Sequence, residues 1–290
     1  MRVQMTKHRD ARMQSGQHTA GADEALQRAM SAIQSQRPEE AARLAQEVLS
    51  RNPGHPNAQH LFGYALLMQD RAEEAIAPLE KAFRSLRDPA IETQLAIAYR
   101  KAGRIDDALS RLGRAAKRKP VFPAALHELG YLLYSLGRTD EAIEVLKAGV
   151  EAAPSMPDLP IMLGWIFHGK NDAVNAKAAF TRALGIAPNH PDALYGIGLL
   201  LMDAGEVQLA AEHFKVALQS NPADEQSRLS LGACLLEMGQ TGGASACLRL
   251  VTRGGPDFYG KALKTLVSSS RGKFWIQPSA AAKFFRGEQG

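Results

Sequence analysis

The stretch from Gly164 to Asn171, which reads G-W-I-F-H-G-K-N, is the segment of this chain that comes nearest to a known chemical motif. In a phosphate-binding loop, backbone amides and a lysine contact the phosphates, and a serine or threonine after that lysine ligates magnesium. Asn171 stands where this hydroxyl is needed. The stretch is also expected to lie in a helix, whereas the motif requires a loop between a strand and a helix. Nucleotide binding here is therefore not expected.

Histidine and cysteine side chains do not form a metal or redox motif either. All zinc ligands must lie about 2 Å from one ion, but His60, His127 and His168 fall in three separate stretches of the chain. Cys234 and Cys247 are interpreted as small core residues of a protein in a reducing compartment, with a redox pair as the alternative. No G-x-S-x-G, H-E-x-x-H or C-x-x-C occurs. The sequence thus predicts no enzyme, metal or cofactor.

A repeat of about 34 residues organises the chain. A small residue stands 12 positions before a recurring alanine, an apolar residue usually stands 4 after it, and a proline follows 12 after it in six of seven copies. This pattern predicts a stack of similar units, whose function lies on the surface that the stack creates. The alanine occupies Ala41, Ala75, Ala108, Ala142, Ala176, Ala210 and Ala244.

Each unit is predicted to hold two helices. Apolar residues recur at helical spacing in residues 192–203 and again in residues 207–219. Gly205 is expected to end the first of these helices, as Gly103, Gly137 and Gly239 do in their units. A glycine inside a helix costs about 0.5–1 kcal/mol relative to alanine, so it needs a packing reason. The expected reason is close contact with the alanine of the second helix, in the pairs Gly198–Ala210 and Gly164–Ala176.

These columns resemble the tetratricopeptide repeat (TPR) family, and the unit with Leu129-Gly130, Ala142, Leu146 and Pro154 matches nearly throughout. The resemblance implies an all-α fold, a right-handed superhelical α-solenoid of helix-turn-helix repeats. Residues 1–21 are expected to be a disordered basic tail, 259–270 a capping helix, and 271–290 a basic aromatic tail that packs on the array or docks on a partner. Between them the resemblance implies seven repeats, at 22–55, 56–88, 89–122, 123–156, 157–190, 191–224 and 225–258.

Charge is concentrated in the two tails. The chain carries a net charge of +5, but residues 1–21 and 259–290 together hold ten Lys or Arg and two acids. The repeats therefore hold 25 bases against 28 acids, and no nucleic-acid partner is expected. The N-terminal residues lack the apolar core of a signal peptide, and no apolar run is long enough for a transmembrane helix. A cytoplasmic location is expected.

The resemblance implies that the first helices of the units line a concave groove. Aromatic, histidine and methionine side chains on this face suit a protein or peptide partner; the alternative is that several of them fill space between helices. Arg100 and Lys101 are the only bases there that could clamp a carboxylate. The predicted partner-binding residues are His60, Tyr64, Met68, Arg100, Lys101, His127, Tyr131, Tyr134, Trp165, His168, Tyr195 and Met202.

One second helix is locally basic. Arg111, Arg114 and Arg118 share a stripe at helical spacing, and Arg104, Lys117 and Lys119 lie close by in the sequence. Such a stripe is typical of a solvated face, and a patch for an acidic partner is the alternative.

Taken together, these features predict a non-catalytic protein-interaction scaffold, which could also form homo-oligomers. The alternative is an accessory or assembly module of an envelope, polysaccharide, sulfotransfer or pilus system.

Overall fold

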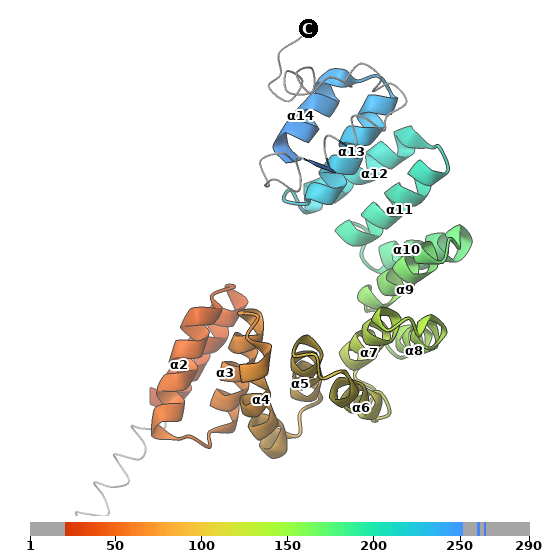
Figure 1. The fold of residues 1–290 in the computed structure, drawn as a ribbon. Helices are drawn as coiled ribbons and strands as arrows, with labels where there is room; N and C mark the ends of the chain where they lie inside the picture. Colours follow the sequence, from red (N-terminus) through yellow and green to blue (C-terminus); the bar gives the residue numbers. More distant parts are fainter. Residues whose placement is uncertain (1–20, 252–259, 262–263, 265–290) are drawn as a thin grey trace, which may run out of the picture. The chain divides into compact units, whose positions relative to one another are not determined.

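The computed structural model describes residues 21–251 together with residues 260, 261 and 264 (Figure 1). The regular elements in this part of the chain are helices. The chain divides into two compact units, residues 1–145 and 146–290. The tails expected at 1–21 and 271–290 and the capping helix expected at 259–270 lie outside the described residues, apart from residues 21, 260, 261 and 264.

In the first unit, a helix over residues 21–34 precedes the labelled helices. Consecutive helices from α2 to α7 contact one another, and α5 also contacts both α3 and α7 (Figure 1). The odd-numbered helices of this unit therefore form one layer. The helices are α2 (Pro38–Arg51), α3 (Pro56–Met68), α4 (Ala72–Leu86), α5 (Pro89–Lys101), α6 (Ile105–Ala115) and α7 (Pro123–Ser135). The division between the units falls within α8 (Thr139–Ala152).

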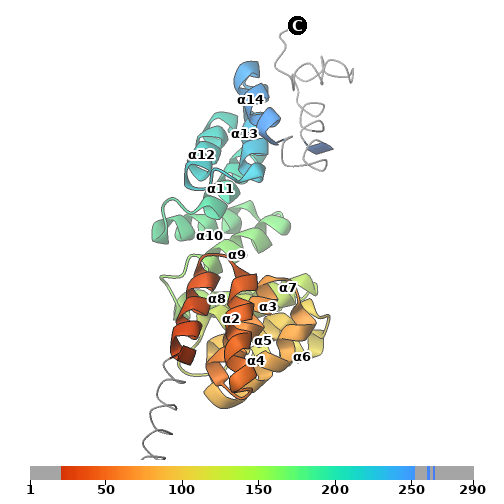
Figure 2. The same cartoon turned by 90° about the vertical axis from the view of Figure 1, so that its left-hand side faces the viewer.

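The second unit repeats this arrangement. Consecutive helices from α9 to α14 contact one another, and α11 also contacts α9 and α13 (Figure 2). The helices are α9 (Asp158–Gly169), α10 (Ala173–Ile186), α11 (Pro191–Asp203), α12 (Val207–Ser220), α13 (Glu225–Glu237) and α14 (Thr241–Val251).

The turns inside the helix pairs confirm the predicted glycine ends. Gly103, Gly137, Gly205 and Gly239 have φ between 75° and 78°, the left-handed region in which glycine carries no steric penalty. In the turn before α6, the Arg104 backbone N–H donates to the Tyr99 carbonyl at 2.8 Å, which satisfies a carbonyl at the end of α5. The same turn position is filled elsewhere by Gln36, Asp70 and Asn171, with φ between 56° and 60°.

The glycines inside the first helices face large side chains, a contact that the sequence pattern did not predict. A Cβ added to Gly198 would lie 2.5 Å from the Phe214 ring, and one added to Gly164 would lie 2.5 Å from the Phe180 ring. The missing side chain makes room for the apolar residue that stands sixteen positions later. Gly63 receives Leu79 in the same way.

Phe180 also joins neighbouring helix pairs. A Cβ added to Gly196 on α11 would lie 2.5 Å from this same ring, so Phe180 of α10 fills space beside both α9 and α11. Both Phe180 and Phe214 are fully buried. The core of the second unit therefore contains two aromatic rings, Phe180 and Phe214, that pack against glycines inside helices.

Candidate functional site

The layer formed by α3, α5 and α7 carries most of the predicted partner-binding residues of the first unit. On α3, the His60 and Tyr64 rings lie 6.5 Å apart, and Met68 at the end of the helix is half-buried. His60 Nε2 lies 2.8 Å from Gln94 Oε1 on α5, so a hydrogen bond joins the two helices. Burial lowers the pKa of His60 below its ordinary value, against the opposing effect of the Gln94 hydrogen bond.

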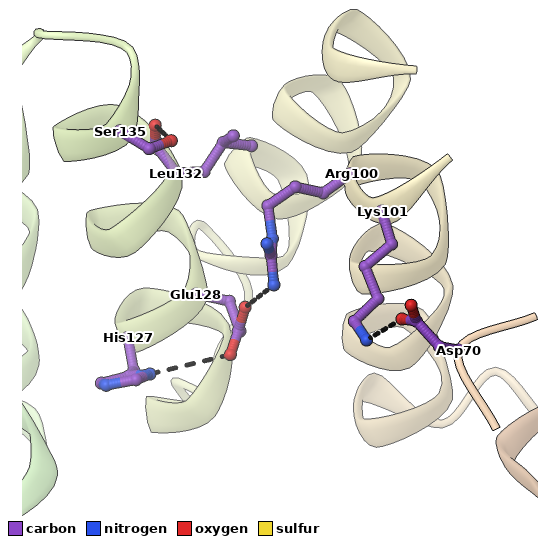
Figure 3. A network of polar contacts seen from close by, with 7 residues as sticks. All are labelled: Asp70, Arg100, Lys101, His127, Glu128, Leu132 and Ser135. Carbon is purple, nitrogen blue, oxygen red and sulfur yellow. Dashed lines mark hydrogen bonds and ion pairs between the residues drawn. The ribbon is translucent and has the colours of Figure 1, made fainter. Parts of the chain in front are cut away.

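Arg100 joins α5 to α7. Its guanidinium carbon lies 4.8 Å from the centre of the Tyr131 ring, a cation–π contact, and its Nη2 lies 3.7 Å from Glu128 Oε2. Figure 3 shows the Arg100 side chain reaching from α5 toward Glu128, with His127 Nδ1 3.8 Å from the other carboxylate oxygen. Among the described residues, the buried Arg100 Nε and Glu128 Oε2 atoms have no hydrogen-bond partner.

Lys101 is paired as well. Its Nζ lies 2.7 Å from Asp70 Oδ1, in the turn between α3 and α4 (Figure 3). The hydrogen bond and charge of Lys101 hold the pKa of the Asp70 carboxyl below its usual range. The two bases that the sequence offers for clamping a carboxylate, Arg100 and Lys101, therefore each face a carboxylate of a neighbouring helix or turn.

Tyr131 and Tyr134 are the exposed aromatic residues of this layer. Their exposed fractions are 40% and 37%, and they stand three positions apart on α7, a spacing that places them on one face. The stack with Arg100 holds one side of the Tyr131 ring. This face of α7 offers a partner two exposed tyrosines, and the contact with Arg100 sets the position of Tyr131 before binding.

In the second unit, the predicted aromatic residues are half-buried. The Trp165 ring centre lies 5.0 Å from that of Phe180 and 5.8 Å from that of Tyr195, and Tyr195 lies 5.7 Å from Phe214. Trp165 and Tyr195 thus pack against Phe180 and Phe214, the two rings that occupy the space beside the helical glycines. The alternative that these side chains fill space between helices describes part of their role.

The remaining predicted residues of this unit surround that aromatic group. The Trp165 and His168 rings meet edge to face at 6.1 Å, and His168 Nε2 lies 3.5 Å from Asp203 Oδ2. The Tyr195 hydroxyl donates to Gln226 Oε1 at 3.4 Å, and burial raises its pKa. Met202 packs against the core cluster of the unit.

Sequence reasoning missed the polar partners on adjacent helix pairs. Each lies roughly one repeat from the predicted residue that it contacts, in the pairs His60–Gln94, Asp70–Lys101, Arg100–Glu128, His168–Asp203 and Tyr195–Gln226. Complementary polar residues at a separation of about one repeat are the sequence signal that could have found them.

The structure also places the segments considered for other chemistry. Gly164–Gly169 lies in α9, followed by Lys170 and by Asn171 with φ 57°, so no loop between a strand and a helix exists there. Cys234 and Cys247 are free thiols, and burial raises the pKa of Cys234 to about 11. Among the described residues, no three His, Cys, Asp or Glu side chains could hold one metal ion.

The same part of the chain contains no helix long and apolar enough to cross a membrane.

Helix pairs packed in series, with glycine turns and glycine holes that recur at one period, define this chain as an all-α helical-repeat protein. Two sequence profiles described as tetratricopeptide repeat match it, one at residues 93–157 and 162–225 and the other at residues 32–96 and 201–267. The chain belongs to the tetratricopeptide repeat family.

Solved structures show the same fold at low sequence identity. The human IFIT1 dimer with m7Gppp-AAAA is 14% identical with a TM-score of 0.66, covering 92% of this chain and 69% of that one. PilF of Pseudomonas aeruginosa is 14% identical with a TM-score of 0.57, covering 73% and 96%. A tetratricopeptide repeat protein from Parabacteroides merdae is 13% identical with a TM-score of 0.58, covering 92% and 98%. No curated protein sequence is significantly similar to the chain.

Proposed function

We propose that this chain is a non-catalytic scaffold that binds a peptide segment of a partner protein on the α5–α7 face of its first unit. TPR repeats generally mediate protein–protein interaction. The observation that carries the proposal is the stack of the exposed Tyr131 ring on Arg100. A tyrosine held in this way offers a large contact area at a small entropic cost on binding, as interface hot spots do.

The charges on this face indicate the kind of peptide. Because Arg100 and Lys101 are already paired with Glu128 and Asp70, a terminal carboxylate would have to displace one of these partners. An extended segment can instead lay an apolar side chain against Tyr131 and Tyr134. The proposed ligand is therefore an extended peptide with an apolar anchor.

The experiment that tests this proposal is capture of partners from native lysate by the full chain, followed by a binding titration with the partner identified. Tyr131→Ala is expected to weaken affinity by about 2 kcal/mol or more, roughly 30-fold, with helicity unchanged. Val174→Ala is the matched control, because Val174 on α10 is a highly exposed apolar side chain of the second unit. Equal affinity of the Tyr131→Ala variant and the wild type would remove the α5–α7 face from the proposal.

The alternative function is an accessory or assembly role in an envelope, polysaccharide, sulfotransfer or pilus system. The likeness to PilF of Pseudomonas aeruginosa, at 14% identity, shows the fold and does not decide between the two. The captured partners separate them, since components of such a system would support the alternative. A cytoplasmic location belongs to the scaffold proposal and is tested by cell fractionation.

A further inference from the structure

Four arginines gather around two aromatic rings on a different part of the first unit. The guanidinium carbon of Arg111 lies 5.3 Å from the centre of the Phe83 ring and 5.7 Å from that of Tyr99. Arg87 and Arg118 approach Phe83 to 5.9 and 5.6 Å, and Arg104 approaches Tyr99 to 4.5 Å. We name this group the arginine cluster; it comprises Arg87, Arg104, Arg111 and Arg118.

The contacts with the rings hold the guanidinium groups close together. Phe83 on α4 and Tyr99 on α5 are buried, so the rings form a fixed base for the arginines that cover them. A guanidinium that lies against a ring keeps the N–H groups at its edge free to donate, and these can bind a carboxylate with two parallel hydrogen bonds. Arg104 and Arg118 remain 45% and 39% exposed at their side chains.

Carboxylates of the chain neutralise only part of this charge. Arg104 pairs with Asp107 at 2.7 Å, and Arg118 pairs with the buried Glu92 at 3.1 Å. Within the described ranges, neither Arg87 nor Arg111 forms an ion pair with a carboxylate. Glu80 also lies beside the cluster, where its Oε1 accepts a hydrogen bond from the Tyr99 hydroxyl. Four guanidinium groups thus face three carboxylates, and Arg87 and Arg111 form no direct ion pair with any of them.

The surrounding sequence concentrates positive charge at the same place. Residues 21–145 hold 17 Lys or Arg and 17 Asp or Glu, yet residues 104–119 alone hold six bases and two acids. Three of those bases, Arg114, Lys117 and Lys119, are exposed and close in sequence to the cluster. A local excess of positive charge in an otherwise balanced unit attracts an acidic partner at this place.

We propose that the arginine cluster docks an acidic segment of a partner protein, one with several Asp or Glu side chains. The charge and the fork geometry of the guanidinium groups suit carboxylates. A single-stranded nucleic acid suits the cluster less well, because Phe83 and Tyr99 are buried beneath the arginines and offer no surface on which bases could stack. This site involves α4, α5 and α6 and stands independently of the α5–α7 face.

The test is fluorescence anisotropy with the full chain and a labelled peptide of eight glutamates between glycine–serine flanks, at low and at physiological salt. The same peptide with glutamines in place of the glutamates is the control ligand. Arg87→Gln with Arg111→Gln is expected to raise the Kd for the glutamate peptide at least tenfold. Arg28→Gln with Arg51→Gln removes the same charge from two exposed arginines of the same unit, and its Kd should stay within twofold of the wild type.

Several outcomes would overturn the proposal. These are no binding of the glutamate peptide, equal binding of the glutamine peptide, or an equal loss in both double variants, which would indicate net charge alone. An oligonucleotide of the same charge that binds as tightly and competes would assign the cluster to nucleic acid instead. Removal of the arginines uncovers two rings, so the variant can lose binding through misfolding alone. NMR of the wild-type chain therefore provides a second measurement. The peptide must shift the side-chain Nε–H signals of the cluster, and shifts confined to other arginines would contradict the proposal.

Discussion

Arg100 shows how a single residue on the α5–α7 face depends on its neighbours. It lies against Tyr131, it faces Glu128, and its Nε is buried without a hydrogen-bond partner among the described residues. A charged group in this position is costly to leave unpaired, so Glu128 contributes to the face although it is no contact residue of its own. The proposed binding through Tyr131 therefore depends on a pair of charges from two helices.

A histidine of the same layer links the stability of the protein to pH. His60 is half-buried and hydrogen-bonded to Gln94, and burial lowers its pKa. The folded protein therefore holds fewer protons at this residue than the unfolded chain does as pH falls below the ordinary histidine pKa of about 6.5. The stability that neutral His60 contributes is complete above that value and is lost as pH falls through the lowered pKa.

We predict that His60→Gln, which keeps a hydrogen-bonding side chain, reduces the loss of stability between pH 8 and pH 5. Urea unfolding of both proteins at several pH values measures this, and the difference between the two curves isolates His60 from the other titrating groups. A variant that loses stability on acidification as steeply as the wild type would show that His60 does not titrate between the two states.

At the scale of helices, the fit of an aromatic ring against a glycine determines how a pair packs. Gly198 on α11 and Gly164 on α9 each leave room for the ring of a phenylalanine on the following helix. The glycine costs helix stability by itself, and the packing of a fully buried ring offsets that cost. The recurring glycine inside the helix thus makes room for a neighbouring side chain. The turn glycines such as Gly205 have a different role, because they adopt a left-handed backbone conformation.

Gly198→Ala is predicted to destabilise the protein by about 1–3 kcal/mol, because the added Cβ would meet the Phe214 ring at 2.5 Å. Gly113→Ala is the matched control: it also lies within a helix, α6, but nothing is within 4 Å of an added Cβ. The control should gain about 0.5–1 kcal/mol from the better helix propensity of alanine. Chemical denaturation followed by circular dichroism gives both values, and changes of the same sign would contradict the packing account.

At the scale of the whole molecule, contacts run mainly between helices that are neighbours in sequence. Within each unit a helix touches the next helix, and the odd-numbered helices α3, α5 and α7, and α9, α11 and α13, also touch the next odd-numbered one. Stability in such an array is approximately the sum of repeat terms and terms for neighbouring interfaces. Damage at one interface should therefore stay near that interface.

Hydrogen exchange can test this locality. Gly198→Ala is expected to raise exchange in α11 and α12 first, then in α9, α10 and α13, and to leave α2 to α5 protected as in the wild type. Faster exchange spread evenly over α2 to α14 would instead show that the described chain unfolds as a single cooperative body.

The repeat period, the helices and their glycine turns could be predicted from sequence, because each depends on residues close together along the chain. A glycine at a helix end needs only a local left-handed conformation, and Gly103, Gly137, Gly205 and Gly239 adopt it as predicted. The resemblance to the family also implies which positions of the first helices share one face, because helical spacing recurs in each unit.

Only the tertiary structure decided what those residues touch. Arg100 meets Glu128, Lys101 meets Asp70, and Gly198 meets the Phe214 ring. Each contact joins helices or turns 16 to 31 residues apart, and it depends on how one helix is rotated and shifted against the next. That rotation follows from the packing of all the side chains between them, a property that no single column of the repeat contains.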